Sequence, residues 1–175
     1  IVSDVHWDNT AEIEKKLQKC RQLINKGLDH HLTKDEATEI DRSLDVEPYA
    51  VLHLNVSCEN LNLLVKNNPF VAVSFLVKMA NYPLISEYLE NLLLSPLSLN
   101  SIDVVSRLTK AARIPNEYLE TYTLKNMKEA MLIPETHKDR AKLSRVIATF
   151  IRSLIKNKVL DISKYENELT DFMNA

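Results

Sequence analysis

The chain contains almost no glycine: one residue in 175, Gly27. Glycine supplies the positive φ that tight hairpins need, and it lets phosphate groups approach backbone amides closely. The scarcity excludes a Walker loop and a dinucleotide-binding fingerprint, and it disfavours type I′ hairpin turns. Short connections rich in Asn, Ser and Pro separate stretches of helical periodicity, so we predict an all-α protein.

Other residue types are scarce as well. Aromatic residues make up 6% of the chain, so aliphatic side chains must fill the core. Cys20 and Cys58 are far apart, without a CxxC motif, and we expect two reduced thiols. The longest nearly apolar run, residues 70–77, is too short to cross a bilayer, and residues 1–8 do not resemble a signal peptide. We expect no membrane partner and, because the chain lacks an initiator Met, an excised fragment.

The net charge of −2 conceals a strong segregation of charge along the chain. Residues 1–60 carry seven basic and twelve acidic side chains, whereas residues 137–158 carry seven basic side chains and Asp139 alone. Two interpretations remain open. The acidic N-terminal part packs beside the basic helix, or the basic helix forms a patch that meets an acidic peptide or RNA.

The periodicity predicts about nine helices joined by short loops, arranged as an antiparallel helix bundle that grades into a short HEAT-like helical array. We divide the chain into an acidic N-terminal helical hairpin, residues 1–46, and a main helical domain, residues 47–175, which contains the basic helix 137–157. The other predicted helices of the main domain cover about 49–54, 58–66, 69–80, 83–92, 101–113 and 116–131, with a last helix after residue 163.

Capping residues set the expected helix ends. Asn9, with Glu12 three residues later, is the predicted N-cap of the first helix, and Gly27 the left-handed residue that ends it. Thr33 and Glu36 form a full capping box. The other predicted N-caps are Ser57, Asn68 before Pro69, Asn100, Thr136 and Ser163.

Motifs for catalysis and metal binding are absent from the sequence. There is no HExxH motif and no glycine-flanked nucleophile elbow. His30 and His31 are adjacent and would chelate one metal poorly, so we interpret them as loop residues. We therefore expect no enzyme activity, no metal and no cofactor.

The candidate partner-binding residues are centred on the basic helix. Arg145, Arg152 and Lys156 follow an i, i+7, i+11 spacing and share one face beside the apolar stripe. That face is suited to salt bridges with an acidic peptide whose Leu or Phe side chains enter an apolar groove. Phe75, in the central helix, and Arg107 complete the set.

Two places are candidates for this groove. One lies between the central helix Pro69–Ala80 and the basic helix. The other lies where the N-terminal hairpin meets the core, where Trp7 would clasp across it, although a lone Trp is more typically a packing anchor than a ligand contact.

Several motifs, in order and spacing, resemble one known family. They are EPYAVLHL (47–54), LVKNNPFVAV (64–73), IDVVSRLT (102–109), IPNEYL (114–119) and FIRSLIKNKV (150–159), together with Trp7-Asp8. The chain resembles the C-terminal domain of subunit eleven of the CCR–NOT messenger-RNA deadenylase complex.

The resemblance implies a non-catalytic adaptor, in the cytoplasm and nucleus, of a complex that shortens poly(A) tails. Contacts with subunit ten and the large scaffold subunit would come mainly from upstream regions. The present domain would recruit regulatory proteins, such as gametogenetin-binding protein two, through a short peptide. The alternatives are an RNA-binding helical domain that uses the basic 137–158 surface, and a generic helical scaffold of an unrelated complex.

Overall fold

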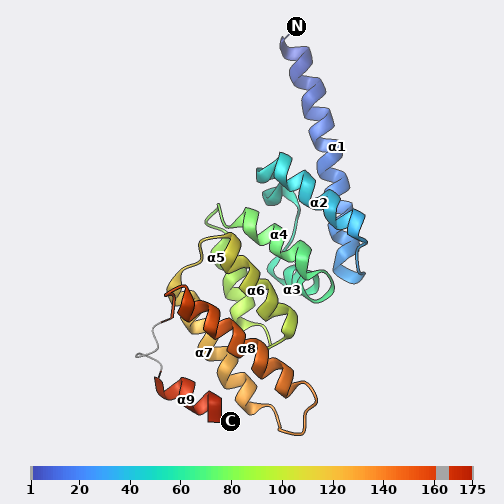
Figure 1. Ribbon diagram of the computed structural model, residues 1–175. Coiled ribbons are helices and arrows are strands. Elements are labelled where there is room, and N and C mark those ends of the chain that lie inside the picture. Colours follow the sequence, from blue (N-terminus) through green and yellow to red (C-terminus); the bar gives the residue numbers. More distant parts are fainter. Residues whose placement is uncertain (1, 161–165, 175) are drawn as a thin grey trace. The chain divides into compact units, whose positions relative to one another are not determined.

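The computed structural model describes the backbone of residues 2–160 and 166–174, and the side chains of residues 11–160 and 166–174. Within these residues the chain forms helices and no strand, which confirms the all-α prediction (Figure 1). Contacts divide the chain into two compact units, Ile1–Asn91 and Leu92–Ala175. The division therefore falls within a later helix and not after residue 46, where the sequence analysis places it.

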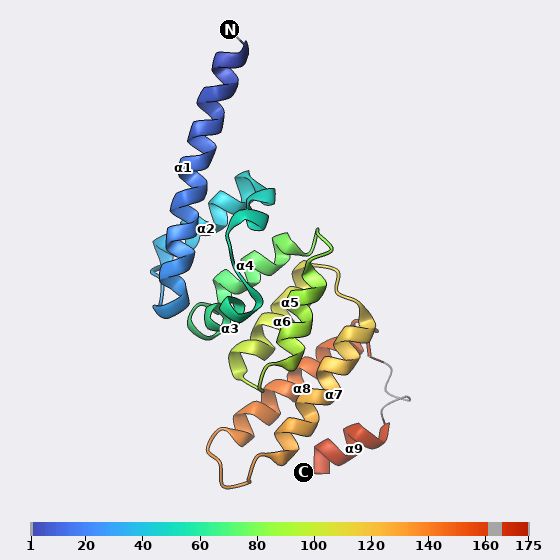
Figure 2. The ribbon, with the colours of Figure 1, turned by 180° about the vertical axis from the view of Figure 1, so that it is seen from behind.

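The first unit contains α1 (Val2–Asp29), α2 (Lys34–Val46), the 3-10 helix η1 (Pro48–His53), α3 (Cys58–Asn67) and α4 (Pro69–Met79). Helix α1 packs on α2 and α3, and α4 packs on α2, α3 and η1 (Figures 1 and 2). The hairpin α1–α2 thus shares one core with the helices that follow it. This is why the unit extends beyond residue 46. Its fully buried residues include Ile24, Ile40, Leu44, Leu61, Leu64, Phe75 and Leu76.

Local caps form at two of the predicted helix starts in this unit. The Thr33 hydroxyl accepts from Glu36 N, and Thr33 N donates to the Glu36 carboxylate, which completes the capping box of α2. Lys26 hydrogen-bonds the same carboxylate at 2.8 Å, and this bond, with that from the Thr33 backbone, lowers the pKa of Glu36. Ser57 caps α3 by accepting from Asn60 N.

The two expected ends of the first helix are wrong. Helix α1 begins at Val2 and continues through Asn9, so Asn9 does not cap it; the side chain of Asn9 lies outside the described residues. Gly27 lies inside α1, and no glycine has a positive φ. A Cβ at Gly27 would come within 2.9 Å of Leu32 Cδ1 and 3.2 Å of Asn68 Nδ2. The glycine therefore permits a close approach of the chain and does not make a left-handed turn.

The polar group that approaches Gly27 is the side chain of Asn68. Its Nδ2 donates to Gly27 O at 2.6 Å and to His30 O at 2.8 Å, and its Oδ1 accepts from Leu32 N at 2.8 Å. Asn67 Nδ2 donates to Leu28 O at 2.6 Å. The expected role of Asn68 is thus corrected: it makes no side-chain cap on α4, and it satisfies the carbonyls that end α1.

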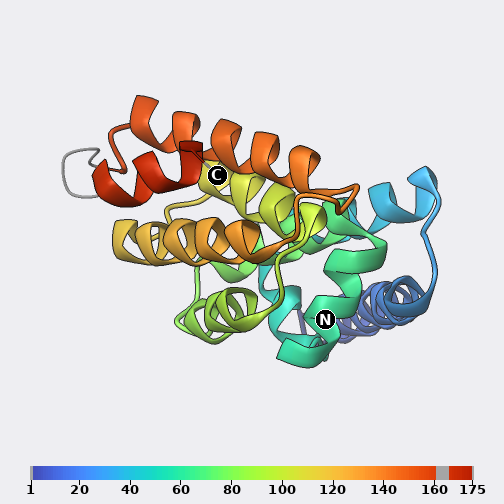
Figure 3. The same ribbon diagram turned by 90° about the horizontal axis from the view of Figure 1, so that it is seen from below.

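Helix α5 (Ile85–Leu94) contains the boundary, and the second unit continues with α6 (Leu99–Ala111), α7 (Asn116–Leu132), α8 (Arg140–Lys156) and α9 (Glu166–Asn174). Helix α8 packs on α6 and α7, and α9 contacts α7 (Figure 3). Tyr122 is at the centre of this unit: its ring lies edge-on to Phe150, with centroids 6.0 Å apart, and its hydroxyl lies 3.0 Å from Ser101 Oγ.

Three predicted caps of the second unit have different outcomes. Helix α6 is capped by Ser98, whose hydroxyl accepts from Ser101 N, and not by Asn100. Thr136 lies in a turn and α8 begins only at Arg140, so Thr136 does not cap it. The capping box at Ser163 lies outside the described residues.

None of the helices in the described ranges combines the length and apolar character needed to cross a membrane.

Candidate binding surfaces

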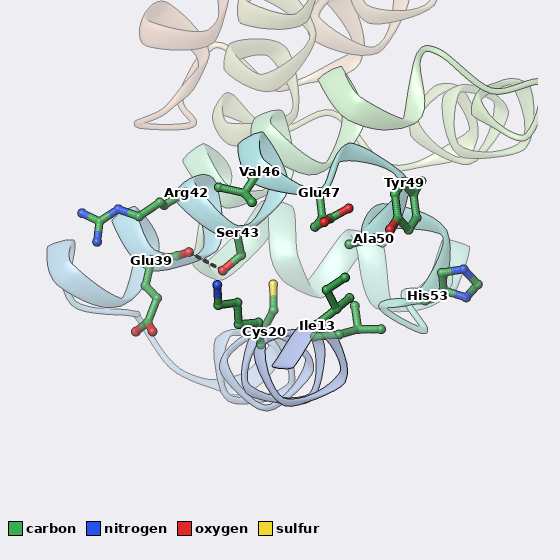
Figure 4. Close-up of a pocket in the computed structure, with 12 residues that line it drawn as sticks. Ile13, Cys20, Glu39, Arg42, Ser43, Val46, Glu47, Tyr49, Ala50 and His53 are labelled. Carbon is green, nitrogen blue, oxygen red and sulfur yellow. Dashed lines mark hydrogen bonds between the residues drawn. The ribbon is translucent and has the colours of Figure 1, made fainter. Parts of the chain in front are cut away.

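The first unit carries a hollow of about 200 Å³ between α1, α2 and η1 (Figure 4). Helix α1 contributes Ile13, Lys16, Leu17 and Cys20; α2 contributes Glu39, Arg42, Ser43 and Val46; the following segment contributes Glu47, Tyr49, Ala50 and His53. This is the second of the two places at which the sequence analysis expects a groove. Trp7, expected to clasp across it, lies outside the residues whose side chains are described.

The hollow forms because the apolar stripe of α1 extends beyond the helices that cover it. Ile24 and Cys20 are buried, whereas Leu17 and Ile13, farther toward the N-terminus, are half-buried. On the opposite wall Val46 is 63% exposed and Tyr49 is 49% exposed. The result is a concave surface with an apolar floor and an apolar rim.

Hydrogen bonds and an ion pair fix the walls of the hollow. Arg21 Nε donates to His53 O at 2.6 Å and ties the end of η1 to α1. Lys19 pairs with Glu39 at 2.7 Å across α1 and α2. Ser43 Oγ donates to Glu39 O at 2.9 Å within α2 (Figure 4). The hollow is therefore preformed by bonds that do not involve its apolar floor.

Cys20 gives a chemical test of this geometry. Burial, with a smaller effect of Glu39, raises the pKa of its thiol to about 11, so the thiol stays protonated at pH 8. Cys58 is less buried. We expect iodoacetamide at pH 8 to modify Cys58 well before Cys20, and Cys20 to react rapidly only in urea, as followed by peptide mass spectrometry. Equal rates for the two thiols in the folded protein would contradict the burial of Cys20.

The second surface is the basic ridge of α8, which we define as Arg145, Arg152 and Lys156. All three side chains are exposed, and their spacing places them on one side of the helix, opposite the buried Leu143, Ile147 and Leu154. Among the described residues none of the three makes an ion pair; Arg145 Nε donates to Ala141 O at 3.3 Å. The three residues share one face, but that face lies opposite the buried stripe and not beside it, where the sequence analysis places it. Their role in binding a partner stays a prediction.

Two grooves flank this ridge. The α6–α8 groove, about 260 Å³, is lined by Ile102, Asp103, Ser106, Arg145, Val146, Thr149 and Phe150. The α8–α9 groove, about 330 Å³, is lined by Ala148, Ile151, Arg152, Ile155, Glu166, Leu169, Thr170, Phe172 and Met173. Arg145 thus lies at the edge of one groove and Arg152 at the edge of the other.

The remaining two predicted contact residues have different positions. Phe75 is 1% exposed and lies edge-on to Tyr88, with ring centroids 5.4 Å apart. It is a core residue, so its expected role as a partner contact is corrected. Arg107 is exposed on α6 and pairs with Asp103 at 3.0 Å, at the edge of the α6–α8 groove. The first expected groove would lie between α4 and α8, which belong to different units, so it stays a prediction.

Titratable groups do not gather into a metal site in the ranges that the structure describes, where no three His, Cys, Asp or Glu side chains are grouped to bind an ion. His30 and His31 lie in the loop after α1, as predicted. His31 Nδ1 lies 2.6 Å from Asn67 O, so its ring takes part in the contact between this loop and the end of α3.

The fold and its surfaces define a class: all-α helical arrays with apolar grooves between neighbouring helices. Residues 65–174 match the family model described as CCR4-NOT transcription complex subunit 11. A curated protein of that name from Dictyostelium discoideum is 25% identical over 163 residues, which cover 93% of this chain. The chain therefore belongs to the CCR4-NOT transcription complex subunit 11 family. It spans 25% of the length of that relative.

Proposed function

We propose that this domain is a non-catalytic adaptor of the CCR4-NOT complex that recruits regulatory proteins in the cytoplasm and nucleus. Membership of the subunit 11 family carries the proposal. The grooves beside α8 and the hollow of the first unit support it, since concave apolar surfaces suit side chains of a protein segment. Recruitment by this domain contributes to poly(A)-tail shortening and repression of messenger RNAs.

The buried polar side chains of the described residues have structural roles. These four side chains are Asn68, Ser101, Thr123 and Asn126. Thr123 and Asn126 donate to backbone carbonyls of α7. Ser101 is hydrogen-bonded to the Tyr122 hydroxyl, and Asn68 donates to the Gly27 carbonyl near the end of α1. All four are used for hydrogen bonds that hold the helices together, which is consistent with a helical domain that offers its surface to partners.

The proposed division of labour within the whole protein can be tested by deletion. Regions upstream of this chain would contact subunit ten and the large scaffold subunit, whereas this domain would bind regulatory proteins, among them gametogenetin-binding protein two. We expect a full-length protein without these residues to co-precipitate subunit ten and the scaffold as before, and to lose the regulatory proteins. Retention of every regulatory protein by the deleted form would refute the adaptor role.

Hydrogen exchange with a bound partner would locate the surface used. Protection at α6 and α8 would assign the partner to the grooves beside the basic ridge, and protection confined to residues 1–45 would assign it to the N-terminal hairpin.

A role in RNA binding is the second candidate function, favoured by the excess of basic residues in 137–158. Binding dominated by phosphate contacts falls by about one log unit per log unit of salt for each contact, whereas apolar docking changes little.

A further inference from the structure

We propose that the basic ridge of α8 and the α6–α8 groove bind an acidic amphipathic helix of a partner protein. Its carboxylates pair with Arg145, Arg152 and Lys156, and one of its large apolar side chains enters the groove. The inference rests on the proposed adaptor function, since it names the chemistry of the partner and the surface that receives it.

The three cations of the ridge are exposed and make no ion pair among the described residues, and they lie in a strongly basic stretch. Residues 137–158 carry a net charge of +6. An ion pair of this stretch joins Arg140, which is outside the ridge, to Glu135 at 3.8 Å. The ridge is therefore an exposed row of cations, and an acidic partner supplies the complementary charge.

The geometry of the ridge suits a helix. Arg145 and Arg152 are separated by about 10 Å along α8, and Arg152 and Lys156 by about 6 Å. A partner helix that runs antiparallel to α8 can match these separations. Its acidic residues would lie on one face, with spacings of seven and four positions along its sequence. A helix placed over the ridge meets an apolar groove on each side of it, so its apolar side chains are desolvated on the same surface.

The α6–α8 groove is the better seat for an apolar anchor. Its floor is made by Ile102, Val146 and Phe150. The carboxylate at its α6 edge, Asp103, is already paired with Arg107, so it does not oppose an acidic ligand as a free charge would. Arg145 at the opposite edge then decides the sign of the potential at the mouth.

RNA is disfavoured as the occupant by the lack of stacking surfaces. Single-stranded nucleic acids bind where basic grooves also present aromatic faces. The one aromatic residue of α8, Phe150, is 5% exposed and packs edge-on against Tyr122. The cations of the ridge could therefore pair with phosphates, but α8 has no exposed aromatic ring on which RNA bases could stack.

The test uses the purified protein and a fluorescent synthetic peptide of about 16 residues, with Glu on one face and Leu and Phe beside it. Comparison probes are the same peptide with Lys in place of Glu, the same peptide with Ser in place of its apolar residues, and an oligoadenylate RNA. The triple variant R145E/R152E/K156E is compared with K15E/K110E/K128E, which changes the net charge equally at exposed positions elsewhere.

We expect the acidic amphipathic peptide to bind, and the ridge variant to weaken it by about tenfold or more, because each carboxylate then meets a like charge. The matched control should change affinity by less than about twofold. T149W, which fills the groove at an exposed position, should weaken the acidic peptide without changing oligoadenylate binding. Circular dichroism confirms that each variant is folded.

Three results would overturn the inference: equal loss of affinity in the ridge variant and the control, equal binding of the peptide that lacks apolar residues, or preferential binding of oligoadenylate. Failure of the adaptor function itself looks different. If the full-length ridge variant retains its regulatory proteins while deletion of this domain removes them, the ridge is wrong and the adaptor stands. If deletion also leaves them bound, the adaptor function is wrong.

Discussion

Replacement of Asn68 by Asp should destabilise the first unit by about 3–5 kcal/mol, because two helix-ending carbonyls lose their donors at once. Asn68 Nδ2 donates to Gly27 O and His30 O, and an Asp side chain has only acceptors to offer them. The new carboxylate would also lie at the negative end of the α1 dipole. The change is isosteric, so the loss reports hydrogen bonding and charge and does not report packing.

Asn25→Asp provides the matched control for this prediction. Asn25 lies near the same end of α1 but is exposed. The substitution Asn25→Asp adds the same negative charge close to the same helix terminus. The unfavourable interaction of that charge with the helix dipole costs about 0.3–1 kcal/mol. Urea unfolding followed by circular dichroism gives both values, and hydrogen exchange shows whether the last turn of α1 and the start of α4 open together. Similar losses in the two variants would show that the Asn68 bonds contribute little.

The helices themselves could be predicted from the sequence because their signals are local. Apolar periodicity, Pro69 at the first position of α4 and the hydroxyls of Thr33 and Ser57 all act within one or two turns. The structure confirms these elements and their order. Such features need no knowledge of what packs against the helix.

The roles of Gly27 and Asn68 could not be predicted in this way. A glycine near a helix end and an Asn before a Pro have local explanations, a left-handed stop and an N-cap. Their actual roles depend on each other across 41 residues of chain. Local rules assign a partner within one turn, so they miss a side chain that arrives from another helix.

The basic ridge of α8 was predictable because it also depends on a local signal, the spacing of residues along one helix. The spacing of Arg145, Arg152 and Lys156 fixes their common face once α8 is a helix, and their charge keeps them exposed. Which apolar residues line grooves is a different matter. Helix α4 is apolar on most of its faces, so periodicity does not separate its core side from its exposed side. This is why the periodicity of α4 does not identify Phe75 as a core residue.

Phe75→Ala should therefore act on stability and not on recognition. Its ring is 1% exposed and packs against Tyr88, so its removal leaves a cavity between α4 and α5 that costs about 3–5 kcal/mol. Phe70→Ala is the control on the same helix, since Phe70 is 63% exposed and its truncation should cost less than about 1 kcal/mol. Urea unfolding of both variants, with hydrogen exchange in residues 1–91, measures the difference.

The same pair of variants separates a core role from a contact role for Phe75. Under conditions in which Phe75→Ala is still folded, its affinity for a partner that binds the α8 ridge should equal that of the unmodified protein. A loss of affinity with unchanged urea stability would mean that the ring contacts the partner directly. That outcome would restore Phe75 to the binding surface, and it would require α4 to expose in the complex a side chain that it buries in the free chain.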